Sequence, residues 1–90
     1  VQRIFFRSRW MKATPLEQEF MSAMAADGGS PARRGEIAER MGRTTQSISM
    51  VRRSLMDKGL IDAPAHGYVE FTAPGFAEFV RREGDPSEEH

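Results

Sequence analysis

One stretch decides the fold class of this chain: Gly35-Glu-Ile-Ala-Glu-Arg-Met-Gly-Arg-Thr-Thr-Gln-Ser-Ile-Ser-Met-Val-Arg-Arg-Ser-Leu-Met-Asp-Lys-Gly-Leu-Ile61. It predicts two short helices joined by a tight turn and followed by a strand, which is the layout of a helix-turn-helix. Ala38 lets the two helices approach closely, and Gly42 suits the left-handed conformation that ends the first helix. Ile48 is expected to be the first inward-facing residue of the second helix, the one that enters a DNA groove in such motifs.

The flanking segments complete the expected order of elements. Thr14-Pro15-Leu16-Glu17 has the residues of a capping box and predicts a helix from there to about residue 26. We expect a short edge strand at 30–32, helices at 33–41 and 45–58, strands at 60–63 and 68–71 around a turn at 64–67, and a last helix from Pro74. This order predicts a mainly α winged helix-turn-helix domain over residues 14–82, with the hairpin around His66 as its wing.

The two ends of the chain differ from this domain in composition. Residues 1–13 mix aromatic and basic side chains without a clear helical period. We therefore expect an extended arm or connector that packs Phe5 or Trp10 onto the domain. Residues 83–90 are mostly acidic and are expected to form a disordered tail.

The net charge is zero, but the charges are unevenly distributed. Residues 1–58 contain eleven Lys and Arg against six Asp and Glu, whereas residues 59–90 contain two against seven. A basic region therefore surrounds the helix-turn-helix, and it suits either DNA phosphates or an ordinary solvated surface. The chain has no cysteine, which fits a cytoplasmic protein, and neither a signal peptide nor a membrane-spanning apolar run is visible.

Several short motifs carry a family resemblance. They are Ala13-Thr-Pro-Leu-Glu, Gly35-Glu-Ile-Ala, Met41-Gly-Arg, Leu55-Met-Asp-Lys-Gly-Leu-Ile61, Pro64-x-His66-Gly67 and Phe71-Thr72-x-Pro74. Together they resemble the C-terminal winged-helix domain of a bacterial, largely actinobacterial, group of AAA-type ATPases, which are related in architecture to archaeal origin-recognition ATPases. The resemblance covers roughly residues 3–82. It implies that the chain is the tail of a longer protein, with ATP and Mg²⁺ bound in an upstream module to which residues 1–13 connect.

The sequence predicts no catalytic, cofactor or metal site within this chain. The glycines at 28 and 29 are not followed by the lysine of a phosphate-binding loop. His66 and His90 are too few for a metal site without carboxylate ligands, and the serines of helix 45–58 have no histidine beside them to activate a nucleophile. We therefore expect no enzyme activity from this chain.

The side of helix 45–58 opposite its apolar stripe carries the candidate DNA contacts. Gln46 can pair with adenine, Met50 with a thymine methyl group, and Arg53 with guanine or a phosphate. Thr45 is expected to offer a free backbone N–H to a phosphate at the helix N-terminus. The predicted DNA-binding residues are Arg33, Arg34, Arg43, Thr45, Gln46, Ser49, Met50 and Arg53. Arg52 borders the buried stripe, so it is expected either to contact the DNA backbone or to hydrogen-bond within the fold.

A second interpretation stays open. The expected wing, residues 62–70, has no Lys or Arg to hold a phosphate. Met50 and Met56 on or near the outer face also suit an adaptable protein contact. The alternative to duplex DNA is therefore a module that docks on its own ATPase module or on a partner protein and so regulates the ATPase.

Overall fold

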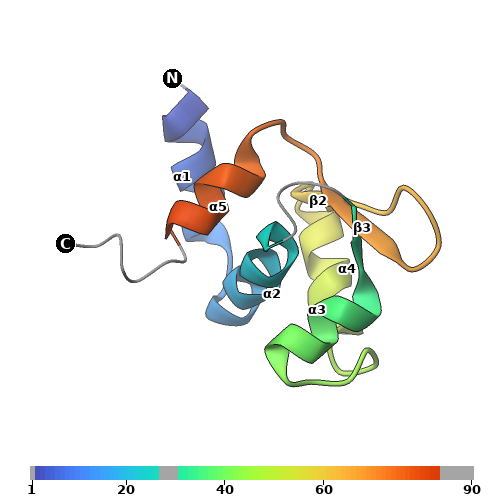
Figure 1. Cartoon of the computed structure of the whole chain (residues 1–90). Helices are drawn as coiled ribbons and strands as arrows, with labels where there is room; N and C mark the ends of the chain where they lie inside the picture. Colours follow the sequence, from blue (N-terminus) through green and yellow to red (C-terminus); the bar gives the residue numbers. More distant parts are fainter. Residues whose placement is uncertain (1, 27–30, 84–90) are drawn as a thin grey trace.

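The computed structural model describes residues 2–26 and 31–83 of the 90-residue chain, with side chains from Phe6 onward. These residues form a mainly helical domain with a small antiparallel sheet (Figure 1). The helices are α1 Gln2–Lys12, α2 Pro15–Ala25, α3 Arg34–Met41, α4 Ser49–Asp57 and α5 Phe76–Glu83, and the strands are β1 Ala32–Arg33, β2 Ile61–Asp62 and β3 Tyr68–Phe71. No helix in this part of the chain is long and apolar enough to cross a membrane.

Residues 2–12 are helical, so the prediction of an extended arm is wrong. Phe6, Trp10 and Ala13 lie one turn apart and face inward, with Trp10 only 8% exposed. The Phe6 ring packs against Phe76 and Phe79 of α5, with ring centroids 5.2 and 5.7 Å apart. A short helix gains most of its stability from such tertiary packing, which local sequence does not reveal. The expected burial of Trp10 is confirmed, whereas the side chain of Phe5 lies outside the described residues.

Helix α2 begins with the predicted capping box. The Thr14 hydroxyl accepts the Glu17 amide at 3.1 Å, and the Glu17 carboxylate accepts the Thr14 amide at 2.9 Å. Phe20 and Met24 are buried, as the apolar spacing predicted, and α2 contacts α3, α4 and α5. The predicted stop at residues 27–29 lies outside the described residues.

Helix α3 ends at the predicted glycine, but α4 begins later than predicted. Gly42 has the left-handed conformation, with φ of 69°, and the amide of the next residue bonds the Ala38 carbonyl at 2.9 Å. Residues 45–48 form turns instead of the first turn of a helix 45–58. The Ser47 hydroxyl donates to the Thr44 carbonyl at 2.9 Å, and the Ser49 hydroxyl donates to the Gln46 carbonyl at 2.8 Å. Such local hydroxyl bonds occupy backbone carbonyls and favour turns over helix.

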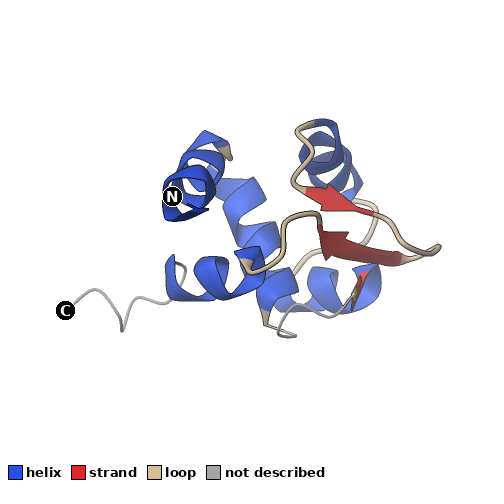
Figure 2. Ribbon diagram, turned by 90° about the horizontal axis from the view of Figure 1, so that it is seen from above, coloured by secondary structure: helices blue, strands red, loops and turns tan. Residues whose placement is uncertain are grey.

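The three strands form an antiparallel sheet in the order β1-β3-β2. Ala32 pairs with Val69, and Ile61 pairs with Phe71. Val69 and Ile61 are buried in the core, whereas Phe71, which the pattern predicted to face inward together with Val69, is half-buried against it. Figure 2 shows the strands grouped toward the end of the molecule opposite the N-terminal helix. Since β1 precedes α3 directly, its pairing with β3 holds the start of α3 against the β2–β3 hairpin.

Helix α5 closes the core, as the apolar pattern after Pro74 predicted. Phe76 and Val80 are buried, and Phe79 is half-buried. The rings of Phe71 and Phe76 meet edge to face at 5.4 Å, which ties β3 to the same aromatic cluster. Glu83 is the last residue of α5, and the rest of the predicted acidic tail, residues 84–90, lies outside the described residues.

Candidate nucleic-acid interface

The predicted DNA-binding residues are divided between two surface hollows. The first hollow lies between the start of α3, the turns at 45–48 and the β2–β3 hairpin, and has a volume of about 380 Å³. It brings together Arg33, Arg34 and Thr45 from the predicted set. Thr45 lines this hollow and does not stand at the N-terminus of α4, whose N-cap is Ile48, so its predicted position at a helix end is wrong.

The backbone explains how the first hollow is held. Arg33 pairs with Tyr68 across β1 and β3, and the Arg34 amide bonds the Gly67 carbonyl at 2.9 Å. These bonds place both arginines beside the tip of the hairpin, although more than thirty residues separate them in sequence. Within the described residues, Nε of Arg34 is buried and has no hydrogen-bond partner.

The charge of the first hollow is balanced. Glu36 and Glu39 line it together with the two arginines, and the hairpin adds His66 and Tyr68. The prediction from sequence included the arginines but missed these four residues. Glu36 and Glu39 are one helical turn apart and therefore lie on one side of α3. Arg33 and Arg34 stand at the start of the same helix. The contribution of the hairpin follows only from its pairing with β1.

The second hollow lies on the outer surface of α4 and also has a volume of about 380 Å³. It is lined by Ser49, Met50 and Arg53 from the predicted set, together with Arg52 and Met56. Met50 is 79% exposed, the highest value among the three large apolar side chains that are exposed in the described residues. The lining of this hollow therefore combines two methionines with two arginines.

The neighbouring residues of the set are placed differently. Arg52 is half-buried, and its Nη1 donates to the Met56 sulfur at 3.4 Å, so it hydrogen-bonds within the fold. Arg53 is exposed, as predicted. Arg43 and Gln46 are also exposed but line neither hollow. Gln46 lies in the turns that precede α4 and not on the helix itself.

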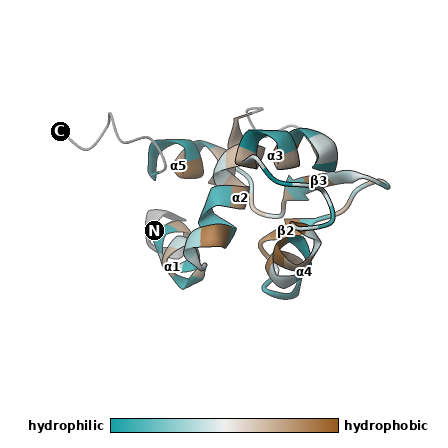
Figure 3. Cartoon of the chain, turned by 90° about the horizontal axis from the view of Figure 1, so that it is seen from below, coloured by the Kyte–Doolittle hydropathy of each residue, from teal (hydrophilic) through white to brown (hydrophobic). Residues whose placement is uncertain are grey.

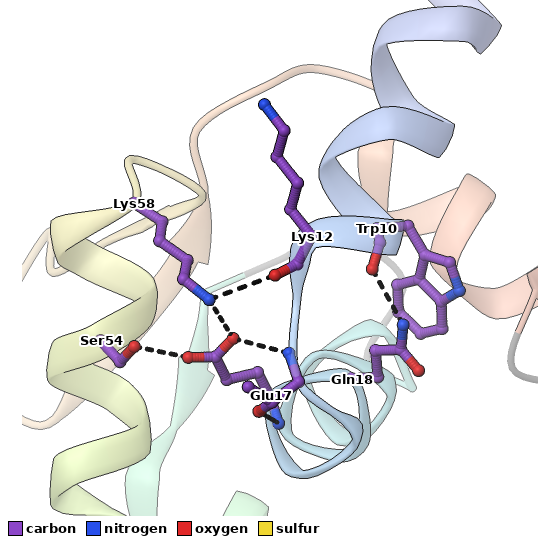
Figure 4. A network of polar contacts seen from close by, with 7 residues as sticks. Trp10, Lys12, Glu17, Gln18, Ser54 and Lys58 are labelled. Atoms are coloured by element: carbon purple, nitrogen blue, oxygen red, sulfur yellow. Dashed lines mark hydrogen bonds and ion pairs between the residues drawn. The ribbon is translucent and has the colours of Figure 1, made fainter.

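The opposite side of α4 is fixed by a buried carboxylate. Glu17 is 4% exposed and receives a hydrogen bond from the Ser54 hydroxyl and another from Lys58 Nζ at 2.6 Å (Figure 4). Lys58 Nζ also donates to the Lys12 carbonyl at 3.3 Å, at the end of α1. One ammonium group thus joins the C-terminal ends of α1 and α4 to the first turn of α2.

The pKa of Glu17 reflects both its burial and its hydrogen bonds. Burial by itself raises the pKa of the carboxyl group. The hydrogen bonds from Lys58, from Ser54 and from the Thr14 amide, together with the positive charge of Lys58, outweigh burial and hold the pKa below its ordinary value of 4.5. Glu17 is therefore ionised at neutral pH and belongs to the framework that positions α4.

Sequence reasoning missed the role of Lys58 and Ser54. Glu17 itself was recognisable, because a capping box requires a glutamate at the third helical position. Lys58 lies 41 residues further along the chain, and no local pattern connects the two. Within residues 2–26 and 31–83, no group of three or more His, Cys, Asp or Glu side chains could hold a metal ion.

Comparison with curated proteins and with solved structures gave no match to the chain. A family model does match, and it covers residues 3–80, which is nearly the whole described structure. The chain belongs to this family, DUF8462, a domain of unknown function.

Proposed function

We propose that this chain is a winged helix-turn-helix domain that binds duplex DNA, with α4 in the major groove. The observation that carries the proposal is the division of α4 into two faces. Ile48, Val51 and Leu55 anchor the helix in the core, whereas Met50 and Arg53 are exposed on the other side. A helix held in this way presents a fixed row of side chains to a groove.

The surroundings of α4 support this proposal. Ala38 and Ile48 are both buried, and Gly42 ends α3 in the left-handed conformation. The sheet order β1-β3-β2 sets the β2–β3 hairpin beside the start of α3, where a wing would lie. In the proposed complex, Met50, Arg53 and Gln46 face base edges, while the arginines at 33, 34 and 43 and the Thr45 hydroxyl face the DNA backbone.

The parent protein is part of the same proposal. On the motifs given above, we place the domain at the C-terminus of a bacterial AAA-type ATPase in the cytoplasm. ATP and Mg²⁺ would bind in the upstream module, and this chain would supply DNA contacts and no catalytic group.

A salt-dependent binding assay tests DNA binding. The anisotropy of a labelled mixed-sequence duplex is measured with the chain at a series of salt concentrations. The affinity is expected to fall steeply as salt rises, because phosphate contacts release counterions. Arg53→Ala is expected to weaken binding by about 1–3 kcal/mol if it contacts a base, or to reduce the salt slope by about 1 if it contacts a phosphate.

The matched control is Arg81→Ala on α5, which removes the same charge from an exposed position away from α4. It is expected to bind DNA as the wild type does. The proposal fails if the wild-type chain does not bind duplex at low salt, or if Arg53→Ala and Arg81→Ala have equal effects.

A second candidate function is docking on a protein surface, and a specific observation favours it. The hollow on α4 holds the 79% exposed Met50 beside the half-buried Met56, and methionine side chains adapt to varied apolar partners. The hairpin residues 62–70 also contain no Lys or Arg. In this alternative, the domain docks on the upstream ATPase module or on a partner protein and regulates the ATPase.

Met50→Glu separates the two functions. An exposed position should accept the change without a shift in melting temperature. If docking is right, the full-length parent should lose the contact between this domain and its ATPase module, as measured by crosslinking, while duplex binding stays absent. If DNA binding is right, the added negative charge should weaken duplex binding.

A further inference from the structure

The N-terminal helix α1 carries positive charges and no negative ones. Its eleven residues, QRIFFRSRWMK, include three arginines and one lysine but no aspartate or glutamate. Among those whose side chains are described, Arg7, Arg9 and Lys12 are exposed. Four cations on a helix that contains no acidic residue create a local positive potential that the neutral total charge conceals.

Helix α1 lies on the same side of the molecule as α4. Figure 3 shows both helices toward one edge of the domain, with α3 and α5 toward the opposite edge and α2 between them. The hydrogen bond from Lys58 Nζ to the Lys12 carbonyl links the end of α4 directly to the end of α1. A rod-shaped partner that lies along this edge of the domain would therefore meet both α4 and α1.

Helix α1 is also held firmly in this place. Trp10 is buried, and its carbonyl accepts a hydrogen bond from Gln18 of α2 at 2.9 Å. At the other end, the Phe6 ring packs on two aromatic rings of α5. The cations of α1 thus stand at defined positions relative to α4, unlike those of a loose arm.

Two of these cations are not used by the fold. Arg7 pairs with Glu83 at 3.4 Å, but the side chains of Arg9 and Lys12 have no hydrogen bond or ion pair within the described part of the chain. Figure 4 shows the Lys12 side chain pointing away from the Glu17 carboxylate, which is already occupied by Lys58. Arg9 precedes Lys12 by three residues and so shares its side of the helix.

We propose that Arg9 and Lys12 of α1 contact the DNA backbone beside the groove that α4 enters. This inference rests on the proposed DNA-binding function and extends its footprint to the N-terminal helix. It also accounts for the lack of cations in the hairpin. Residues 62–70 offer no Lys or Arg, so the phosphate contacts that a cationic wing provides come here from α1.

The test is a salt titration of duplex binding by the double variant Arg9→Gln/Lys12→Gln in the full 90-residue chain. If both residues contact phosphates, the slope of log affinity against log salt should be smaller by about 2, because each contact contributes about 0.9. Hydroxyl-radical footprinting should show a shorter protected stretch on the duplex. The melting temperature should not change, since neither side chain has a partner among the described residues.

The matched control is Arg81→Gln/Arg82→Gln, which removes two exposed positive charges from α5, the helix that packs on α1 but carries no proposed DNA contact. It should keep the wild-type slope and footprint. Equal slopes for both double variants, or an unchanged footprint for Arg9→Gln/Lys12→Gln, would overturn the role of α1. If Arg53→Ala still weakened binding in that case, the proposed function of α4 would stand. No duplex binding by the wild type at low salt would overturn both proposals.

Discussion

The two faces of α4 differ in how completely the fold uses them. On the inner face, Leu55 is fully buried, and Ser54 and the following Lys58 both bond the Glu17 carboxylate. On the outer face, Met50 and Arg53 are exposed and make no contact that the fold requires. The stability of the fold therefore depends on the inner face of α4, and the proposed binding uses the outer face. Changes on the inner face should alter unfolding, and changes on the outer face should alter binding.

The largest expected effect is on the inner face. Leu55→Ala removes a fully buried side chain from the core, so the free energy of unfolding should fall by about 2–5 kcal/mol. Chemical denaturation measures this change. Met50→Ala, in the same helix, is the control, and its effect should stay within about 0.5 kcal/mol because the side chain is exposed. Similar losses for the two variants would contradict the division of the helix into two faces.

A smaller loss is expected when the buried carboxylate is removed. Glu17→Ala leaves Ser54, Lys58 and the Thr14 amide without their acceptor, so we expect the free energy of unfolding to fall by about 1–3 kcal/mol. Glu19→Ala is the matched control, because Glu19 is exposed in the same helix. Equal stabilities of the two variants would show that the Glu17 site does not hold α4.

The Glu17 carboxyl should also make stability depend on pH. Its pKa in the folded state lies below the ordinary value of 4.5, so the unfolded chain binds more protons than the folded one in that range. The contribution of Glu17 is therefore present above pH 4.5 and is lost as the pH falls toward the folded-state pKa. Melting temperatures of the wild type and Glu17→Gln should converge on acidification. A gap between them that stays constant down to acid pH would rule out this linkage.

The smallest effects should distinguish two adjacent arginines. Arg52 is half-buried and contacts Met56, so Arg52→Ala should lower the free energy of unfolding by about 0.5–1.5 kcal/mol. Arg53 is exposed, and Arg53→Ala should leave stability unchanged while weakening duplex binding. Thermal melts and duplex titrations of both variants give the comparison. If both variants lost the same stability and the same duplex affinity, the two faces of α4 would not differ in the way proposed.

Much of the secondary structure was predictable from sequence, because the signals are local. The capping box at Thr14, the left-handed Gly42 and the apolar stripe of α4 each involve residues within a few positions of one another. The sequence pattern did not predict that residues 45–48 form turns in place of the first turn of the helix expected at 45–58. There, the hydroxyls of Ser47 and Ser49 bond nearby carbonyls and leave residues 45–48 as turns.

The candidate site was predictable as a set of residues but not as an arrangement. Six of the eight residues named from sequence line two separate hollows, whereas Arg43 and Gln46 line neither. His66 and Tyr68 join the first hollow because β1 pairs with β3, whereas Glu36 and Glu39 join it because they lie on α3. Strand pairing between distant segments leaves no local pattern, since each strand alternates in the same way whichever neighbour it has.

The start of α2, the glycine turn after α3 and the side of α4 that faces the core follow from the sequence alone, since capping, backbone conformation and periodicity act over a few residues. The tertiary structure was needed to show that residues 2–12 form a helix, that Lys58 joins α1 to α4, and that α1 and α4 lie toward the same edge of the domain. These features depend on contacts such as Phe6 with Phe76 and Glu17 with Lys58. Partners so far apart in the chain meet only after the core has formed.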